Sequence, residues 1–145
     1  MFKGILIATD GSECAAKATG SGLQLAKSLG ARAVALTATE PWPTMVNAKA
    51  MGINFPSAEY ETASKAEAAR ILGEVYAQSQ ALGVDCELLH VTDFPADAII
   101  AAAKANACDL IVMASHGRRG VRRLLLGSQA TKVVALSSVP VLVCR

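Results

Sequence analysis

The sequence predicts an α/β fold: a single domain of three layers, α/β/α, with a five-stranded parallel sheet. Two observations favour this class. Short, continuously apolar segments alternate with helical segments, as expected for strands that helices bury on both faces. Of the 145 residues, 52% are apolar but only 4% are aromatic, so aliphatic side chains must form the core. This length suits one domain, which we expect to span residues 1–145.

The first two strands and the helix between them have clear signals. From Gly4 to Ala8 the chain is continuously apolar, which predicts a buried strand. The polar turn 9–12 leads into an alanine-rich helix over residues 13–29, which Gly30 ends. A second apolar strand is predicted over residues 33–39.

A long connection and a long helix follow the second strand. Residues 44–56 fit neither the helical nor the strand period, and in a compact domain such a segment is usually functional or disordered. Trp42 either covers a pocket or packs beneath this connection, and packing is the preferred interpretation. An amphipathic helix is then predicted over residues 57–81.

The C-terminal half repeats the alternation of strands and helices. Its predicted elements are a strand over 85–91, a helix over 95–106, a strand over 109–114, a helix over 128–136 and a strand over 140–144. The alternating order of these elements implies right-handed crossovers and a parallel sheet with helices on both faces. The polar segments 9–12 and 114–128 both follow strands, so both should lie at the carboxyl edge of the sheet, where such folds bind ligands.

Composition excludes several classes of partner and location. A net charge of +2 is too small to favour nucleic acid or an anionic membrane as a partner. No apolar run approaches the roughly 20 residues of a membrane span, and the N-terminus lacks a signal-peptide pattern. The four cysteines have no CxxC or metal-ligand spacing, which favours free thiols in a reducing compartment and no metal site. We therefore expect a cytoplasmic protein.

The glycine-bearing segment 114–128 is the strongest functional signal. Gly117 lets the backbone approach an anion closely, and Gly127 and Ser128 open a helix whose N-terminus favours a phosphate. The spacing is neither that of a P-loop, GxxxxGKS/T, nor that of a dinucleotide fingerprint, GxGxxG. The alternative interpretation is that the glycines only turn the chain and that Ser128 is an ordinary helix cap.

The same segment resembles a known family. Its spacing, Ala114-x2-Gly117-x9-Gly127-Ser128, is similar to the G-x2-G-x9-G-S/T motif in the ATP-binding branch of the universal stress protein family. The start of the chain resembles the first strand and turn of that family, and the end of the chain resembles its last strand. The resemblance covers essentially the whole chain. It implies a Rossmann-like, adenine-nucleotide alpha-hydrolase-like fold. It also implies a homodimer formed around the strand from Val139 to Cys144.

The resemblance implies a function and a set of site residues. The function is that of a stress-response sensor or regulator that binds ATP, ADP or AMP, with Mg²⁺ carried on the phosphates. Positions that match the family's nucleoside contacts are Ala8, Thr9, Asp10, Ala38, Met113 and Ala114. Positions that match its phosphate contacts are Gly117, Gly127 and Ser128, followed by the backbone N–H groups of Gln129 and Ala130.

Two of these positions have a competing interpretation. Ala114 stands where the motif has its first glycine, and its methyl could crowd the ribose or strain the backbone, so we expect weakened binding. Asp10 lies in a Thr-Asp-Gly-Ser segment that is also ordinary turn and helix-cap chemistry.

The charged and titratable residues of the loop leave alternatives open. Four arginines lie within six residues and either screen phosphate charge or form a solvated surface: Arg118, Arg119, Arg122 and Arg123. His116 contacts a ligand, acts as a base or does neither, the last being the preferred interpretation. His90, at a strand end, is expected to be structural.

Other functions remain as alternatives. The chain shows no convincing general base, nucleophile or carboxylate pair, so we expect no catalytic residues and at most very slow ATP hydrolysis. An interaction module of the same fold without a working nucleotide site is the second hypothesis, and Ala114 favours it. A phosphorylated receiver domain would need an acidic cluster, which Asp10 and Asp93 alone do not supply.

Overall fold

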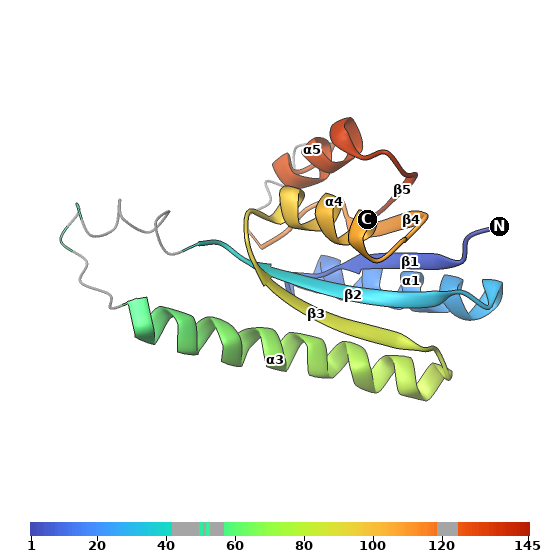
Figure 1. Ribbon diagram of the computed structural model, residues 1–145, viewed down its shortest axis with the longest axis horizontal. Coiled ribbons are helices and arrows are strands. Elements are labelled where there is room, and N and C mark those ends of the chain that lie inside the picture. Colours follow the sequence, from blue (N-terminus) through green and yellow to red (C-terminus); the bar gives the residue numbers. More distant parts are fainter. Residues whose placement is uncertain (42–49, 51, 53–56, 119–124) are drawn as a thin grey trace.

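The computed structural model describes residues 1–41, 50, 52, 57–118 and 125–145. Its elements in chain order are β1 (Gly4–Ala8), α1 (Glu13–Leu29), β2 (Arg32–Thr39), α3 (Ser57–Leu82), β3 (Cys86–Thr92), α4 (Pro95–Ala105), β4 (Leu110–Ala114), α5 (Ser128–Leu136) and β5 (Val141–Cys144) (Figure 1). Each bound lies within one residue of its prediction. Trp42 and nearly all of the connection 44–56 lie outside the described residues.

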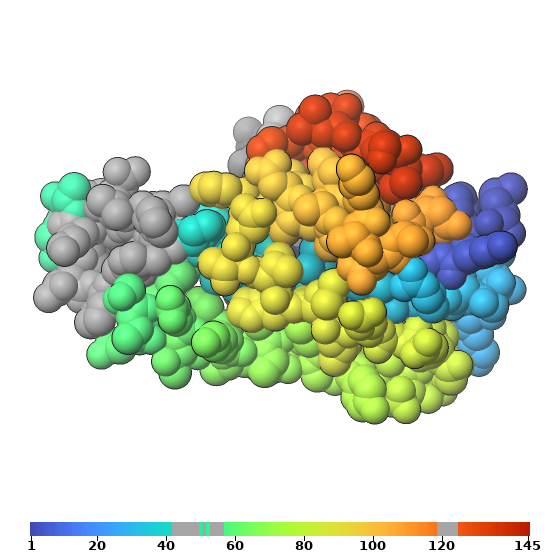
Figure 2. Space-filling model, in the orientation of Figure 1, coloured from blue at the N-terminus to red at the C-terminus, as the bar shows by residue number. Residues whose placement is uncertain are grey.

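The predicted architecture is confirmed. The five strands are all parallel and lie in the order β3-β2-β1-β4-β5. Helices α1 and α3 cover one face of the sheet, and α4 and α5 cover the other (Figure 1). In the space-filling view the atoms of α4 and α5 form one continuous layer (Figure 2). Among the described helices, none has the length and apolar character to cross a membrane.

The central strand β1 shows why its sequence is continuously apolar. Ile5 and Ile7 point into the core beneath α1 and α3, whereas Leu6 and Ala8 point into the core beneath α4 and α5. A strand that is buried on both faces has no position for a polar side chain. The strand order reverses between β1 and β4, which makes this the switch point where such sheets bind ligands.

Two glycines of α1 lie in different surroundings. The sequence predicts close packing against the sheet at both Gly20 and Gly22. This is confirmed for Gly22, where an added methyl would lie 2.9 Å from the Ile7 side chain and 3.3 Å from Val112. It is wrong for Gly20, where an added methyl would have no neighbour within 4 Å.

These surroundings predict opposite effects of one chemical change. Gly20→Ala should raise the free energy of unfolding by about 0.5–1 kcal/mol, since alanine is the better helix former. Gly22→Ala should lower it by about 1–3 kcal/mol, because the methyl overpacks the core. Urea unfolding measures the free energy of unfolding of each variant. A change of the same sign in both variants would contradict this account.

A carboxylate joins the starts of two neighbouring strands. Asp109, just before β4, accepts the N–H of Lys3 at 3.0 Å and the N–H of Gly4 at 3.1 Å. These backbone donors, that of Lys3 above all, hold the pKa of Asp109 below its ordinary value. Asp109 thereby helps to fix the register of β4 against β1.

This carboxylate predicts a pH dependence. A depressed pKa in the folded state adds stability above the unfolded pKa of about 3.9, and this stability is lost as the pH falls through the folded value. Asp109→Asn should therefore be less stable than the unmodified protein at neutral pH. The difference should shrink below about pH 4. Urea midpoints from neutral to acidic pH measure it, and a constant difference would contradict the assignment.

Candidate functional site

A cavity of about 820 Å³ opens at the carboxyl edge of β1, β2 and β4. Its walls come from the ends of these strands, from one side of α3 and from the start of α5. All eleven site residues expected from the sequence line it: Ala8, Thr9, Asp10, Ala38, Met113, Ala114, Gly117, Gly127, Ser128, Gln129 and Ala130. The fold thus brings them to one place, while their contacts with a ligand remain predictions.

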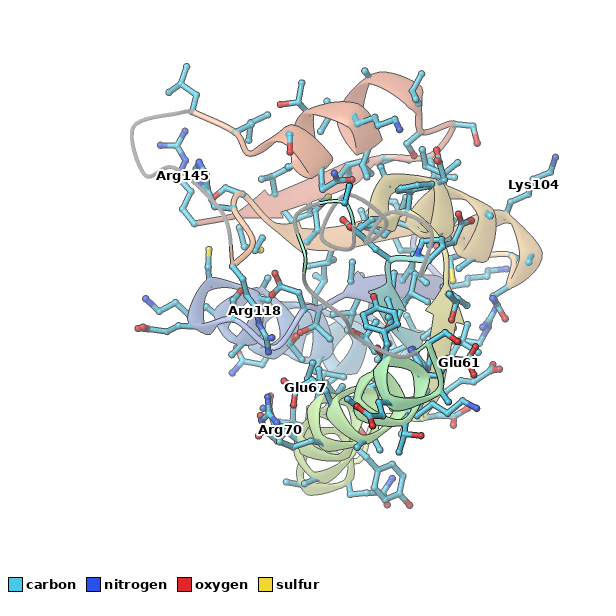
Figure 3. All side chains as sticks on the ribbon, turned by 90° about the vertical axis from the view of Figure 1, so that its left-hand side faces the viewer. Glu61, Glu67, Arg70, Lys104, Arg118 and Arg145 are labelled. Carbon is cyan, nitrogen blue, oxygen red and sulfur yellow. The ribbon has the colours of Figure 1, made fainter. Side chains whose placement is uncertain are left out.

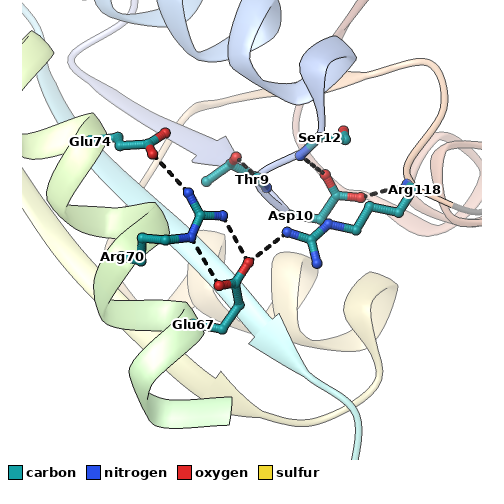
Figure 4. A network of polar contacts seen from close by, with 8 residues as sticks. Thr9, Asp10, Ser12, Glu67, Arg70, Glu74 and Arg118 are labelled. Carbon is teal, nitrogen blue, oxygen red and sulfur yellow. Dashed lines mark hydrogen bonds and ion pairs between the residues drawn. The ribbon is translucent and has the colours of Figure 1, made fainter. Parts of the chain in front are cut away.

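Asp10 joins the turn after β1 to the loop after β4. Its Oδ1 accepts the backbone N–H of Ser12 at 2.9 Å, and its Oδ2 accepts the backbone N–H of Arg118 at 2.9 Å (Figure 4). The first bond is the local turn chemistry expected from the sequence. The second spans 108 residues of chain and fixes the position of the glycine loop.

Gly117 is required by this close approach. A methyl on Gly117 would lie 2.6 Å from Oδ2 of Asp10, well inside van der Waals contact. The backbone of Gly117 has no positive φ, so steric space rather than backbone conformation excludes a larger residue. Without a side chain here, the loop can pack directly onto the carboxylate.

The start of α5 is bare, in the sense that no described side chain caps its N-terminal N–H groups. Gly127 is its N-cap residue, and the N–H of Gly127 donates to the carbonyl of Ser115 at 2.7 Å. Ser128 is the first helical residue, so the interpretation of Ser128 as the helix cap is wrong. The first three N–H groups of α5, on residues 128–130, have no partner within the helix, and no described side chain caps them. Such a terminus attracts an anion.

Gln129 links the starts of two helices. Its Oε1 accepts the backbone N–H of Ala96 at 3.1 Å, in the first turn of α4. The side chain is therefore turned towards α4. Its backbone N–H remains at the start of α5, as the sequence predicts.

Ala114 has ordinary strand geometry. It lies in β4, and its φ is not positive, so the backbone strain suggested by the missing glycine is not present there. Its side chain packs with Ala15 and Ala18 of α1. The methyl is thus accommodated by small residues on the α1 side of the sheet.

The two histidines have different surroundings. Nδ1 of His116 lies 3.0 Å from the hydroxyl of Ser115, whereas its Nε2 is buried without a hydrogen-bond partner among the described residues. A buried polar atom left unpaired costs about 1–3 kcal/mol, so a ligand that pairs with it gains binding energy. Nε2 of His90 lies 2.8 Å from Oγ1 of Thr39, which agrees with a structural role.

A network of charges crosses the cavity edge. Nη2 of Arg118 lies 2.7 Å from Oε1 of Glu67, and Arg70 donates to both oxygens of Glu67 at 2.8 and 2.9 Å (Figure 4). Arg70 also pairs with Glu74 at 2.7 Å. Hydrogen bonds from Arg70 and then from Arg118 lower the pKa of Glu67 to about 2. Arg119, Arg122 and Arg123 lie outside the described residues.

The contribution of α3 to this site is not apparent in the sequence. Glu67, Ser64 and Tyr60 all line the cavity, yet the charged side of this helix resembles a solvent-facing surface. Arg70 stands three residues after Glu67 and four before Glu74, which signals local ion pairs but not the contact with Arg118. That contact depends on how α3 packs beside the glycine loop.

A glycine loop and a bare helix start at the switch point of a parallel sheet are typical of α/β proteins that bind nucleotides. The chain belongs to the universal stress protein family, whose family model matches residues 1–145. It is 40% identical to a universal stress protein of Thermus aquaticus encoded beside a QAH/OAS sulfhydrylase, with both chains fully covered.

Solved structures agree with this assignment. The structure of MJ0577 from Methanocaldococcus jannaschii has a TM-score of 0.81 and 25% identity, with 99% of this chain and 96% of that chain covered. A universal stress protein solved in complex with cAMP has a TM-score of 0.69 and 26% identity, with 99% and 97% covered.

Proposed function

We propose that this protein binds an adenine nucleotide, ATP, ADP or AMP, in the cavity and acts as a homodimeric stress-response sensor or regulator. The observation that carries the proposal is the bare start of α5. The N–H groups of residues 128–130 have no hydrogen-bond partner among the described residues, and all three residues line the cavity. A phosphate placed there accepts from those N–H groups and interacts favourably with the helix dipole.

Part of the cavity wall suits a nucleoside. It is apolar and includes Leu36, Ala38, Ile99 and Met113. Mostly apolar walls with a few polar groups are typical of sites for small ligands. The relative solved with cAMP supports an adenine nucleotide as the ligand.

Mg²⁺ would accompany the phosphates rather than occupy a protein site. No group of three or more His, Cys, Asp or Glu side chains that could hold a metal ion occurs in the described part of the chain. A cation would thus be held mainly by phosphate oxygens, as is common for Mg²⁺ at nucleotides.

Two of the three carboxylates that line the cavity, Asp10 and Glu67, fit a protein that binds its ligand without rapid turnover. Both oxygens of Asp10 accept backbone N–H groups, and Glu67 is paired with two arginines. Neither carboxylate is free to act as a general base. We therefore propose a binding protein whose ATP hydrolysis, if measured, is very slow.

The proposed homodimer forms around β5. This strand pairs with β4 on one side and forms the edge of the sheet on the other, with Leu142 41% exposed. Val134 and Leu136 of the adjacent α5 are also exposed. An apolar edge of this kind favours pairing with a second copy.

The test is direct. Mass spectrometry of protein purified under mild conditions should detect a retained adenine nucleotide, and calorimetry on nucleotide-free protein should give micromolar dissociation constants. Absence of heat with ATP, ADP and AMP would reject nucleotide binding. It would favour the second candidate, an interaction module of the same fold, although the ordinary geometry of Ala114 now gives that candidate less support.

A further inference from the structure

One residue, Arg118, connects two walls of the cavity. The backbone N–H of Arg118 is bound to Asp10 at the edge of the sheet, and its guanidinium reaches across to Glu67 on α3 (Figures 3 and 4). Both side chains line the cavity. Nη2 of Arg118 also lies 3.0 Å from the place of a methyl on Gly11, so the guanidinium lies over the turn after β1.

Glu67 does not depend on Arg118 for its charge balance. Arg70 donates to both of its oxygens, and Oε1 is shared between Arg70 and Arg118. With a pKa of about 2, Glu67 is ionised at neutral pH. If Arg118 moves away, the carboxylate keeps the two bonds from Arg70. Arg118 can therefore exchange Glu67 for another anion without leaving an unpaired charge.

A phosphate chain supplies such an anion. The N–H groups of residues 128–130, which have no partner among the described residues, suffice for one phosphate, but each added phosphate brings negative charge that these groups do not neutralise. Arg118 follows Gly117 directly and is the one Lys or Arg among the described residues that line the cavity. Glu67, in contrast, repels the added phosphates and competes with them for the guanidinium.

We propose that the Arg118–Glu67 ion pair sets the selectivity of the site for the number of phosphates. Glu67 holds Arg118 in the ligand-free protein, and a diphosphate or triphosphate takes Arg118 from it, whereas a monophosphate leaves the pair intact. The proposal rests on the proposed function, since it concerns the same cavity.

The experiment compares three variants with the unmodified protein by calorimetry with ATP, ADP, AMP and inorganic tripolyphosphate. Glu67→Gln should tighten ATP and tripolyphosphate about three- to tenfold and change AMP less than about twofold. Arg118→Met should weaken ATP and tripolyphosphate about tenfold, again with little effect on AMP. Glu74→Gln is the matched control, because Glu74 pairs with Arg70 but not with Arg118. It should change none of the four affinities.

The outcomes separate this proposal from the proposed function. Equal changes for ATP and AMP, or no gain in Glu67→Gln, would overturn the selectivity role of the pair. A second outcome is that nucleotides do not bind, while tripolyphosphate binds more tightly to Glu67→Gln and more weakly to Arg118→Met. In that case the nucleotide function fails and the role of the pair stands. If tripolyphosphate does not bind either, both are rejected. Melting curves confirm that each variant is folded.

Discussion

Gly127→Val is expected to weaken ATP binding about 100-fold while the protein stays folded. The new Cβ would lie 3.0 Å from the carbonyl oxygen of Ser115 and 3.4 Å from Cα of His116, both backbone atoms. The N–H of Gly127 donates to that same carbonyl at 2.7 Å, so the loop and the start of α5 must separate. Losing two charge-assisted hydrogen bonds to a phosphate costs about 3 kcal/mol, which corresponds to about 100-fold.

Calorimetry with ATP measures this change, and circular dichroism monitors the fold. Gly20→Ala is the matched control, because it also adds a side chain to a glycine but in open space. Its affinity for ATP should equal that of the unmodified protein. Full affinity in Gly127→Val would show that the start of α5 does not bind the phosphates.

Asp10→Asn is expected to weaken ATP binding at least about tenfold and to lower the free energy of unfolding by about 1–2 kcal/mol. Asp10 accepts two backbone N–H groups, those of Ser12 and Arg118, through separate oxygens. An asparagine has one oxygen and one NH₂ group, so one of these donors faces another donor. Whichever bond is lost, the glycine loop and the turn after β1 are no longer held by the same side chain.

The control for Asp10 is a similar aspartate elsewhere. Asp93 follows β3 and accepts the N–H of Phe94 at 2.8 Å, but it does not line the cavity. Asp93→Asn should therefore leave the affinity for ATP unchanged, as measured by the same titration. Equal losses in both variants would point to a general effect on stability and would contradict a specific role of Asp10.

The fold could be predicted well because its signals are local. A strand such as β1 that is buried on both faces must be continuously apolar, and glycine at position 30 in a left-handed conformation marks the end of α1. Helix and strand bounds follow directly from such signals. Gly20 shows their limit, because the sequence does not reveal which glycine of a helix faces the sheet.

The sequence predicts which residues of the site come together, because strand ends and a motif mark them, but it does not predict their contacts. Asp10 and Gly117 were expected near one another because both follow strands that meet at one edge. Two details could not be predicted, because they depend on small differences in atomic position that no sequence pattern contains. Gly117 accommodates the Asp10 carboxylate, and Gly127 rather than Ser128 is the N-cap residue. The contact of Glu67 with Arg118 depends on packing between elements 51 residues apart.

The bond between Gln129 and the N–H of Ala96 has a thermodynamic consequence. It holds the start of α4 beside the start of α5 before any ligand binds, and residues of both starts, Pro95 and Ser128, line the cavity. The conformational entropy of holding the two ends at that spacing is therefore lost during folding and not again on association. A ligand that contacts both helix starts therefore binds without the entropic cost of bringing them together.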